Sequence, residues 1–170
     1  MRTLNVLIVD DEVFVVDWLT SIFDAERSMS LNLFSCYGVE EARSIIRENR
    51  IDILMTDIRM PDGNGLDLVD EIHRHWADCK VLMLTAYSEF EYAQRAIQSG
   101  VDGYILKTEK DDYILSEMRR VVDELNHTLD ERQQKTSIQR DLDHYRHSYR
   151  SAVFFHWLRG HYMTAEQLEK

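Results

Sequence analysis

Four acidic residues stand where apolar runs of the sequence end. Asp10, Asp11 and Glu12 follow one such run, and Asp57 closes another. Acidic residues at a helix start would explain part of the triplet. Carboxylates that share a pocket, however, repel one another unless a cation lies among them, and Mg²⁺ accepts carboxylate, water and phosphate oxygens. A carboxylate can also attack phosphorus and form an aspartyl phosphate. The pattern therefore predicts a Mg²⁺ site at which Asp57 accepts a phosphoryl group.

Two further polar residues close apolar runs later in the chain. Thr85 follows residues 81–84, and Lys107 follows residues 104–106. A lysine supplies a compact positive charge, and a threonine hydroxyl can donate a hydrogen bond to a phosphoryl oxygen. Either residue alone at the end of a strand is commonly structural or solvated. Their repetition at the ends of consecutive strands favours a shared site.

The elements that would position these residues alternate between strands and helices over the first ~125 residues. Such alternation indicates a parallel sheet with helices on both faces. The predicted fold is α/β, a flavodoxin-like doubly wound sheet of five parallel strands in the order 2-1-3-4-5, which gathers the strand ends at one edge. The strands are expected at residues 4–9, 31–37, 53–58, 81–84 and 104–106, and the helices at 13–23, 40–48, 66–75, 88–99 and from 111 onward.

Composition limits the classes of protein to consider. The chain has 170 residues and a formal net charge of −11, which argues against nucleic-acid binding through a basic patch and is otherwise explained by solubility. Cys36 and Cys79 have no metal-ligand spacing and are expected as core residues in a reducing compartment. Neither a signal peptide nor a membrane-spanning run is found in the sequence, so a cytoplasmic location is expected.

Together, these motifs resemble the receiver domain of bacterial two-component response regulators. The resemblance covers residues 1–125 in order and spacing, and it rests on Val9-Asp10-Asp11-Glu12, Met55-Thr56-Asp57-Ile58-Arg59-Met60-Pro61, Gly65, Leu84-Thr85-Ala86 and Leu106-Lys107. It implies that Asp57 is the phosphoacceptor and is loaded by a sensor histidine kinase. It also implies that Mg²⁺ is held by Asp57, by Asp11 directly, by Asp10 through water and by Arg59 through its backbone carbonyl.

The resemblance assigns the phosphoryl-binding and switch residues as well. Thr85 and Lys107 would hold the phosphoryl group, and Tyr104 would be the aromatic residue that turns inward when the threonine moves. One departure lies at Thr108, where the family usually has a proline, often after a cis bond. Since a cis bond before another residue costs about 3 kcal/mol, we expect a trans bond and a different loop shape here.

The sequence after the receiver is expected to be a helical linker and dimerisation segment, residues 126–170. Two sets of apolar residues have heptad spacing, and a polar stretch at 130–137 puts them out of phase. We therefore expect a last receiver helix, a polar joint and a second helix, with a homodimer formed through the helices. The sets are Met118, Val122, Leu125 and Leu129, then Ile138, Leu142, Tyr145 and Tyr149.

The output of the protein is expected to be transcriptional. The run Ser88–Ala93 and the helical extension resemble receivers placed ahead of an AraC-type helix-turn-helix domain, which would lie outside this chain. A receiver with a protein-binding or phosphorelay output is the alternative. A Mg²⁺-dependent phosphohydrolase would need a second acidic residue two positions after Asp57, but that residue is Arg59. The chain is therefore not expected to be an enzyme.

Overall fold

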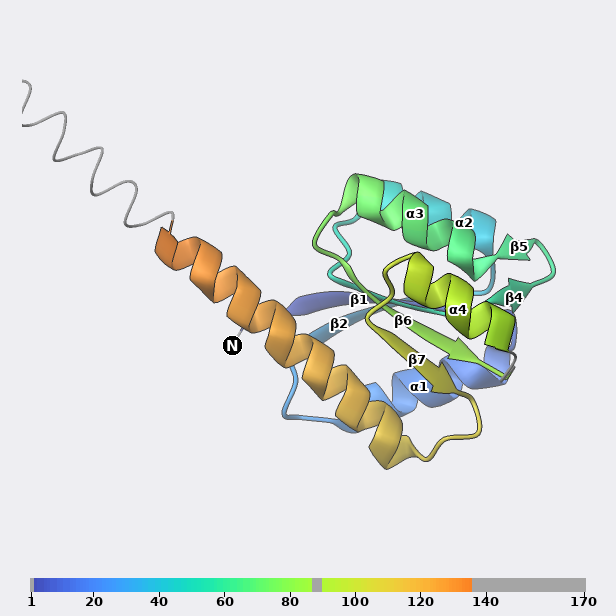
Figure 1. The fold of residues 1–170 in the computed structure, drawn as a ribbon. Helices are drawn as coiled ribbons and strands as arrows, with labels where there is room; N and C mark the ends of the chain where they lie inside the picture. The colour runs from blue at the N-terminus through green and yellow to red at the C-terminus, as the bar shows by residue number, and fades with distance from the viewer. Residues whose placement is uncertain (1, 87–89, 136–170) are drawn as a thin grey trace, which may run out of the picture. The chain divides into compact units, whose positions relative to one another are not determined.

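A computed structural model describes residues 2–86 and 90–135 of the chain. Five apolar runs pair into one parallel sheet in the order β2-β1-β3-β6-β7, which is the predicted order (Figure 1). The β3 strand is buried throughout, as expected for a strand covered on both faces. The strands are β1 (Leu4–Val9), β2 (Leu31–Cys36), β3 (Ile53–Thr56), β6 (Lys80–Thr85) and β7 (Gly103–Leu106).

Helices cover both faces of this sheet. Figure 1 shows α2 and α3 together on one face with α4, and α1 on the other face with the start of the helix formed by residues 111–135. Alternate side chains of β1 point to opposite faces of the sheet. Leu7 and Val9 belong to the apolar cluster beneath α2 and α3. The labelled helices are α1 (Val13–Ala25), α2 (Val39–Glu48), α3 (Gly65–His75) and α4 (Phe90–Gln98).

A small hairpin after β3 is absent from the sequence prediction. Strands β4 (Arg59–Met60) and β5 (Gly63–Asn64) pair antiparallel directly behind Asp57. Strands of two residues are too short to show any periodicity. The hairpin leads into α3, where the Asn64 side chain accepts a hydrogen bond from the Leu66 N–H at 2.9 Å and caps the helix.

The spacing of apolar residues in 13–23 predicts one inward face, and the structure confirms that face only in part. The predicted positions are Phe14, Val15, Trp18, Leu19, Ile22 and Phe23. Leu19 and Phe23 are buried as predicted, but Phe14 is 79% exposed and Val16 is buried in its place. Phe14 lies in the first turn of α1, only a few residues after β1 ends at Val9. The helix therefore packs along a narrower stripe than the sequence pattern suggests.

The helix formed by residues 111–135 departs from two expectations. Met118, Val122 and Leu125 are almost completely buried within the first of two compact units, residues 1–126, so this part of the heptad pattern packs in the core of that unit. The expected polar joint does not begin at residue 130, because the chain is helical through residue 135. Expectations for the second apolar set lie outside the described residues, as do those for Ser88 and Glu89.

Other local expectations are confirmed. Glycine is favoured just after a helix, and Gly100, with φ +77°, follows α4 as its C-terminal cap, with its N–H 3.1 Å from the Ile97 carbonyl oxygen. Cys36 and Cys79 are buried free cysteines, and burial raises the pKa of the Cys36 thiol to about 12. Across the described ranges, we find no helix with the length and apolar character needed to span a bilayer.

Candidate functional site: an acidic cluster at the carboxyl edge of the sheet

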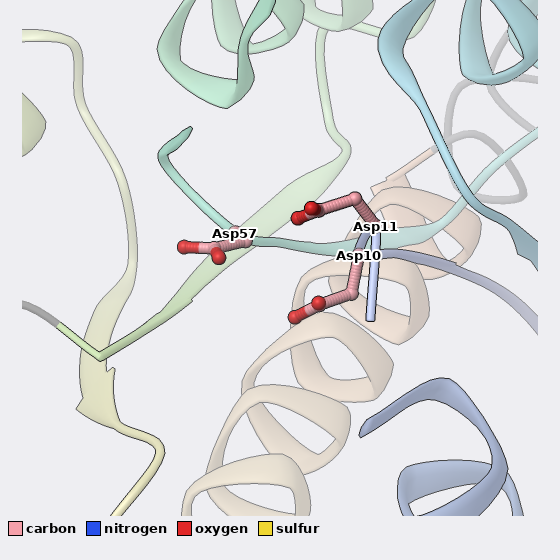
Figure 2. Close-up of side chains that lie close together, drawn as sticks. All are labelled: Asp10, Asp11 and Asp57. Atoms are coloured by element: carbon pink, nitrogen blue, oxygen red, sulfur yellow. The ribbon is translucent and has the colours of Figure 1, made fainter. Parts of the chain in front are cut away.

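Three of the predicted acidic residues meet where β1 and β3 end. Carboxylate oxygens of Asp10, Asp11 and Asp57 lie within 4.8 Å of one another. Figure 2 shows the three carboxylates on the same side of the strand ends. The parallel register pairs Val9 with Thr56, so the residues that follow each of them arrive side by side. Asp10 and Asp57 are buried, whereas Asp11 is more accessible.

Lys107 reaches this cluster from the end of β7. Its Nζ lies 2.8 Å from Asp10 Oδ2, 2.9 Å from Asp57 Oδ2 and 2.8 Å from Glu12 Oε1. Burial alone would lower the pKa of this ammonium, but the three carboxylates outweigh burial and the pKa is raised. Lys107 is therefore charged at neutral pH, and it neutralises only part of the acidic charge around it.

Asp10 is the most constrained member of the cluster. Its Oδ1 accepts a hydrogen bond from the Glu12 N–H at 3.0 Å, and its buried Oδ2 lies 2.8 Å from Lys107 Nζ. Burial raises the pKa of Asp10, and the Lys107 ammonium offsets this only in part. A hard divalent cation would supply the positive charge that one ammonium does not provide for three clustered carboxylates. The donor set thus fits Mg²⁺.

The carboxylate of Asp57 is oriented by its own loop. Its Oδ1 accepts a hydrogen bond from the Ile58 N–H at 2.6 Å, which leaves Oδ2 facing Lys107. Gly65 packs against the backbone here, since a Cβ at this position would overlap the Asp57 carbonyl oxygen and lie 2.7 Å from Thr56 Oγ1. The Gly65 N–H donates to the Ile58 carbonyl oxygen at 2.8 Å. The first residue of α3 therefore holds the loop that carries Asp57.

The remaining predicted site residues lie around this centre. Thr85 is fully buried at the end of β6, and its carbonyl oxygen accepts the Lys107 N–H at 2.8 Å. Tyr104 is partly buried against the core, three residues before the lysine. Arg59 has an exposed side chain in β4, two residues after Asp57. The peptide bond before Thr108 is trans, as predicted.

The sequence draws attention to Glu12 as part of the acidic triplet but does not reveal that Lys107 is its partner. The resemblance assigns no role to Glu12, and its carboxylate lies outside the three-residue cluster and pairs with Lys107. Asp62 was also missed. Its Oδ2 accepts a hydrogen bond from the Glu40 N–H at 3.3 Å, and this supplies α2 with the cap that Gly38 lacks. Only the Asp-Gly pair in the turn hinted at a structural role for Asp62.

Comparison with curated proteins identifies relatives among bacterial regulators. An uncharacterized response regulatory protein of Staphylococcus epidermidis is 36% identical over 103 residues, which cover 61% of this chain and 40% of that protein. The uncharacterized transcriptional regulatory protein YesN of Bacillus subtilis is 27% identical over 142 residues, covering 84% and 39%. The transcriptional regulatory protein HptR of Staphylococcus aureus is 35% identical, covering 61% and 40%. The chain thus spans about two fifths of the length of these relatives.

Solved structures agree on the fold. A CheY-like receiver domain protein from Methanospirillum hungatei has a TM-score of 0.68 at 24% identity, over 75% of this chain and 99% of that one. The non-phosphorylated HemR receiver domain from Leptospira biflexa has a TM-score of 0.64 at 26% identity, over 70% and 94%. The family model of the response regulator receiver domain matches residues 6–119. The chain belongs to the response regulator receiver domain family.

Proposed function

We propose that this receiver is a phosphorylation-activated switch of a two-component system, with Asp57 as the phosphoacceptor. The observation that carries the proposal is the meeting of Asp57 with Asp10, Asp11 and Lys107 at one edge of the sheet. The proposed donor is a phosphohistidine on a sensor kinase. The family membership supports such a partner, and the acidic cluster supports the chemistry.

In the proposed transfer, an oxygen of Asp57 forms a bond to phosphorus as the P–N bond to the donor imidazole breaks. The electron pair of that bond returns to the imidazole nitrogen, which takes up a proton from solvent so that the imidazole ends neutral. Bound Mg²⁺ would neutralise charge on the transferring oxygens and reduce repulsion between the donor and the carboxylates. Asp10, Asp11, Asp57 and the backbone carbonyl of Arg59 are its proposed ligands.

The other site residues receive their roles from what they can donate. Lys107 would bind a phosphoryl oxygen through its ammonium, which already lies 2.9 Å from Asp57 Oδ2. The Thr85 hydroxyl would donate to another phosphoryl oxygen. Tyr104 would then move inward; it lies on the neighbouring strand β7, where it pairs with Met83, two residues before Thr85 on β6. Such a change would bias a two-state equilibrium of this face.

The proposed output is control of transcription through a DNA-binding domain outside this chain. Two relatives, YesN and HptR, carry the name of transcriptional regulatory proteins. The division into a receiver, residues 1–125, and a helical linker, residues 126–170, belongs to this proposal, as does a cytoplasmic location. A full-length protein that binds no promoter DNA after phosphorylation would favour a protein-binding or phosphorelay output.

A homodimer is proposed to form through the helical segment. Its contact cannot use Met118, Val122 and Leu125, which are buried in the receiver core. The apolar positions left for the dimer are Leu129, which is half-buried, and the later ones, Ile138, Leu142, Tyr145 and Tyr149. Light scattering on the phosphorylated chain tests this proposal. We expect the mass of a dimer for the wild-type sequence and the mass of a monomer when Leu142 and Tyr145 are changed to serine.

Phosphorylation itself is tested by intact mass spectrometry. We expect one phosphoryl adduct after incubation with acetyl phosphate and Mg²⁺, and none in the Asp57→Asn variant or in the presence of a chelator. Asp67→Asn, which changes an acidic residue in the first turn of α3, is the control and should keep the adduct. An unmodified wild-type mass, or an adduct that persists in Asp57→Asn, would refute the assignment. Sustained hydrolysis of small phosphate esters would instead favour a phosphohydrolase.

A further inference from the structure

Glu12 is an exposed acidic residue with a fixed partner. Its side chain is 60% exposed, yet Oε1 accepts a hydrogen bond from Lys107 Nζ at 2.8 Å. The backbone of Glu12 is held by other contacts, since its N–H donates to Asp10 Oδ1 and its carbonyl oxygen accepts the Val15 N–H at 2.9 Å. Its side chain forms no cap with α1. The carboxylate is thus positioned at the site and has no structural role in the helix.

Glu12 differs from the other two partners of Lys107. Asp10 and Asp57 are buried members of the cation cluster, so a divalent cation competes with the ammonium for both of them. Glu12 lies outside that cluster, and a bound cation leaves its carboxylate available. Because the cation and the ammonium also repel each other, Glu12 becomes the favoured partner of Lys107 once the cation is in place.

Glu12 helps a cation to bind, but it hinders the binding of a phosphoryl group on Asp57. Its oxygens require the Lys107 ammonium, and Glu12 competes with them for it while adding a negative charge close by. An exposed carboxylate paired with a largely buried ammonium can therefore favour the cation and oppose the anion at one site. The side chain of Lys107 is only 10% exposed, so it has few other partners in solvent.

We propose that Glu12 is a positioning residue that draws Lys107 away from the cation ligands and thereby strengthens Mg²⁺ binding while weakening the binding of a phosphoryl group. This inference rests on the proposed function, in which Asp57 is phosphorylated with Mg²⁺ bound. It assigns Glu12 a role through Lys107 and not as a ligand of either group.

The test measures two affinities by calorimetry on the full chain. The probes are Mg²⁺ alone and, at saturating Mg²⁺, beryllofluoride, which mimics a phosphoryl group on a carboxylate. For Glu12→Gln we expect Mg²⁺ to bind about two- to fivefold more weakly and beryllofluoride about two- to fivefold more tightly, the range that an exposed ion pair supports. Changes of opposite sign would not follow from a general loss of stability.

Two matched variants separate contact from charge. Glu12→Asp keeps the charge but shortens the side chain by one methylene, so it should lose the 2.8 Å contact and shift both affinities as Glu12→Gln does. Asp17→Asn removes another exposed carboxylate of α1 and should change neither affinity. A Glu12→Asp variant that behaves as wild type would overturn the proposal, because charge at a distance would then suffice.

The failure of this inference can be told apart from failure of the proposed function. A wild-type chain that binds both probes, together with a Glu12→Gln variant of unchanged affinities, would overturn the role of Glu12 alone. A wild-type chain that binds neither Mg²⁺ nor beryllofluoride would overturn the proposed function and this inference with it.

Discussion

Replacement of Gly65 by alanine tests whether the start of α3 holds the Asp57 loop. The added Cβ would overlap the Asp57 carbonyl oxygen and lie 3.0 Å from the carbonyl carbon, so the backbone must move. Overpacking of this kind costs about 1–3 kcal/mol. A weakened hydrogen bond from the Gly65 N–H to Ile58 adds about 0.5–1.5 kcal/mol. We therefore expect Gly65→Ala to lower the free energy of unfolding by about 2–4 kcal/mol, a large part of an ordinary domain's stability.

The assay is urea unfolding followed by circular dichroism, together with Mg²⁺ titration of the folded protein. Gly100→Ala is the matched control, because Gly100 has φ +77° but open space around it. A left-handed alanine costs about 1–2 kcal/mol from backbone strain alone, and Mg²⁺ affinity should stay unchanged in that variant. Gly65→Ala should weaken Mg²⁺ binding as well, since Asp57 is displaced. If Gly65→Ala unfolds no earlier than Gly100→Ala and binds Mg²⁺ as wild type does, the close packing inferred at Asp57 is wrong.

Three further predictions concern charge and capping. Burial raises the pKa of Asp10, so the ionised carboxylate opposes folding at neutral pH. Asp10→Asn should therefore raise the melting temperature at pH 7 without Mg²⁺. This gain should vanish below about pH 4, where the wild-type carboxyl is protonated in the folded and the unfolded state. A hydrogen bond from Arg119 lowers the pKa of Glu26 to about 2, so its stabilising effect is present above pH 4.5 and is lost as the pH falls toward 2. Urea titrations at pH 6 and pH 3 should therefore show that the free energy of unfolding falls less between these two pH values in Glu26→Gln than in wild type. Asp62→Ala removes the acceptor of the Glu40 N–H and should cost about 1 kcal/mol, whereas Asp62→Asn should retain most of the stability.

The sheet and the core of the site were predictable because both follow from local patterns. Each strand is a short apolar run, and a parallel sheet brings the residues after such runs to one edge. Asp10, Asp57 and Lys107 are each adjacent to the end of a strand, so their meeting required only the strand order. No information about side-chain packing was needed for this part.

The remaining features depend on contacts that spacing does not specify. Met118, Val122 and Leu125 have the same spacing whether the helix packs on a sheet or on a second helix, and they are buried in the receiver core. Phe14 fits the apolar arc of α1 but lies at its exposed first turn. The partner of Glu12 is 95 residues away in sequence, and only the folded chain shows that pairing.

The order in which the site residues appear along the chain bears on synthesis. Asp10 and Asp57 directly follow β1 and β3, but Lys107 follows β7, the last strand of the sheet to be translated. A ribosome-bound chain that has exposed only its first four sheet strands carries the carboxylates without their ammonium. Such a nascent chain holds an incomplete form of the proposed acceptor site, which is complete only after β7 has left the ribosome and paired with β6. If the proposed function holds, phosphoryl transfer to Asp57 has to wait until the whole sheet has been synthesised.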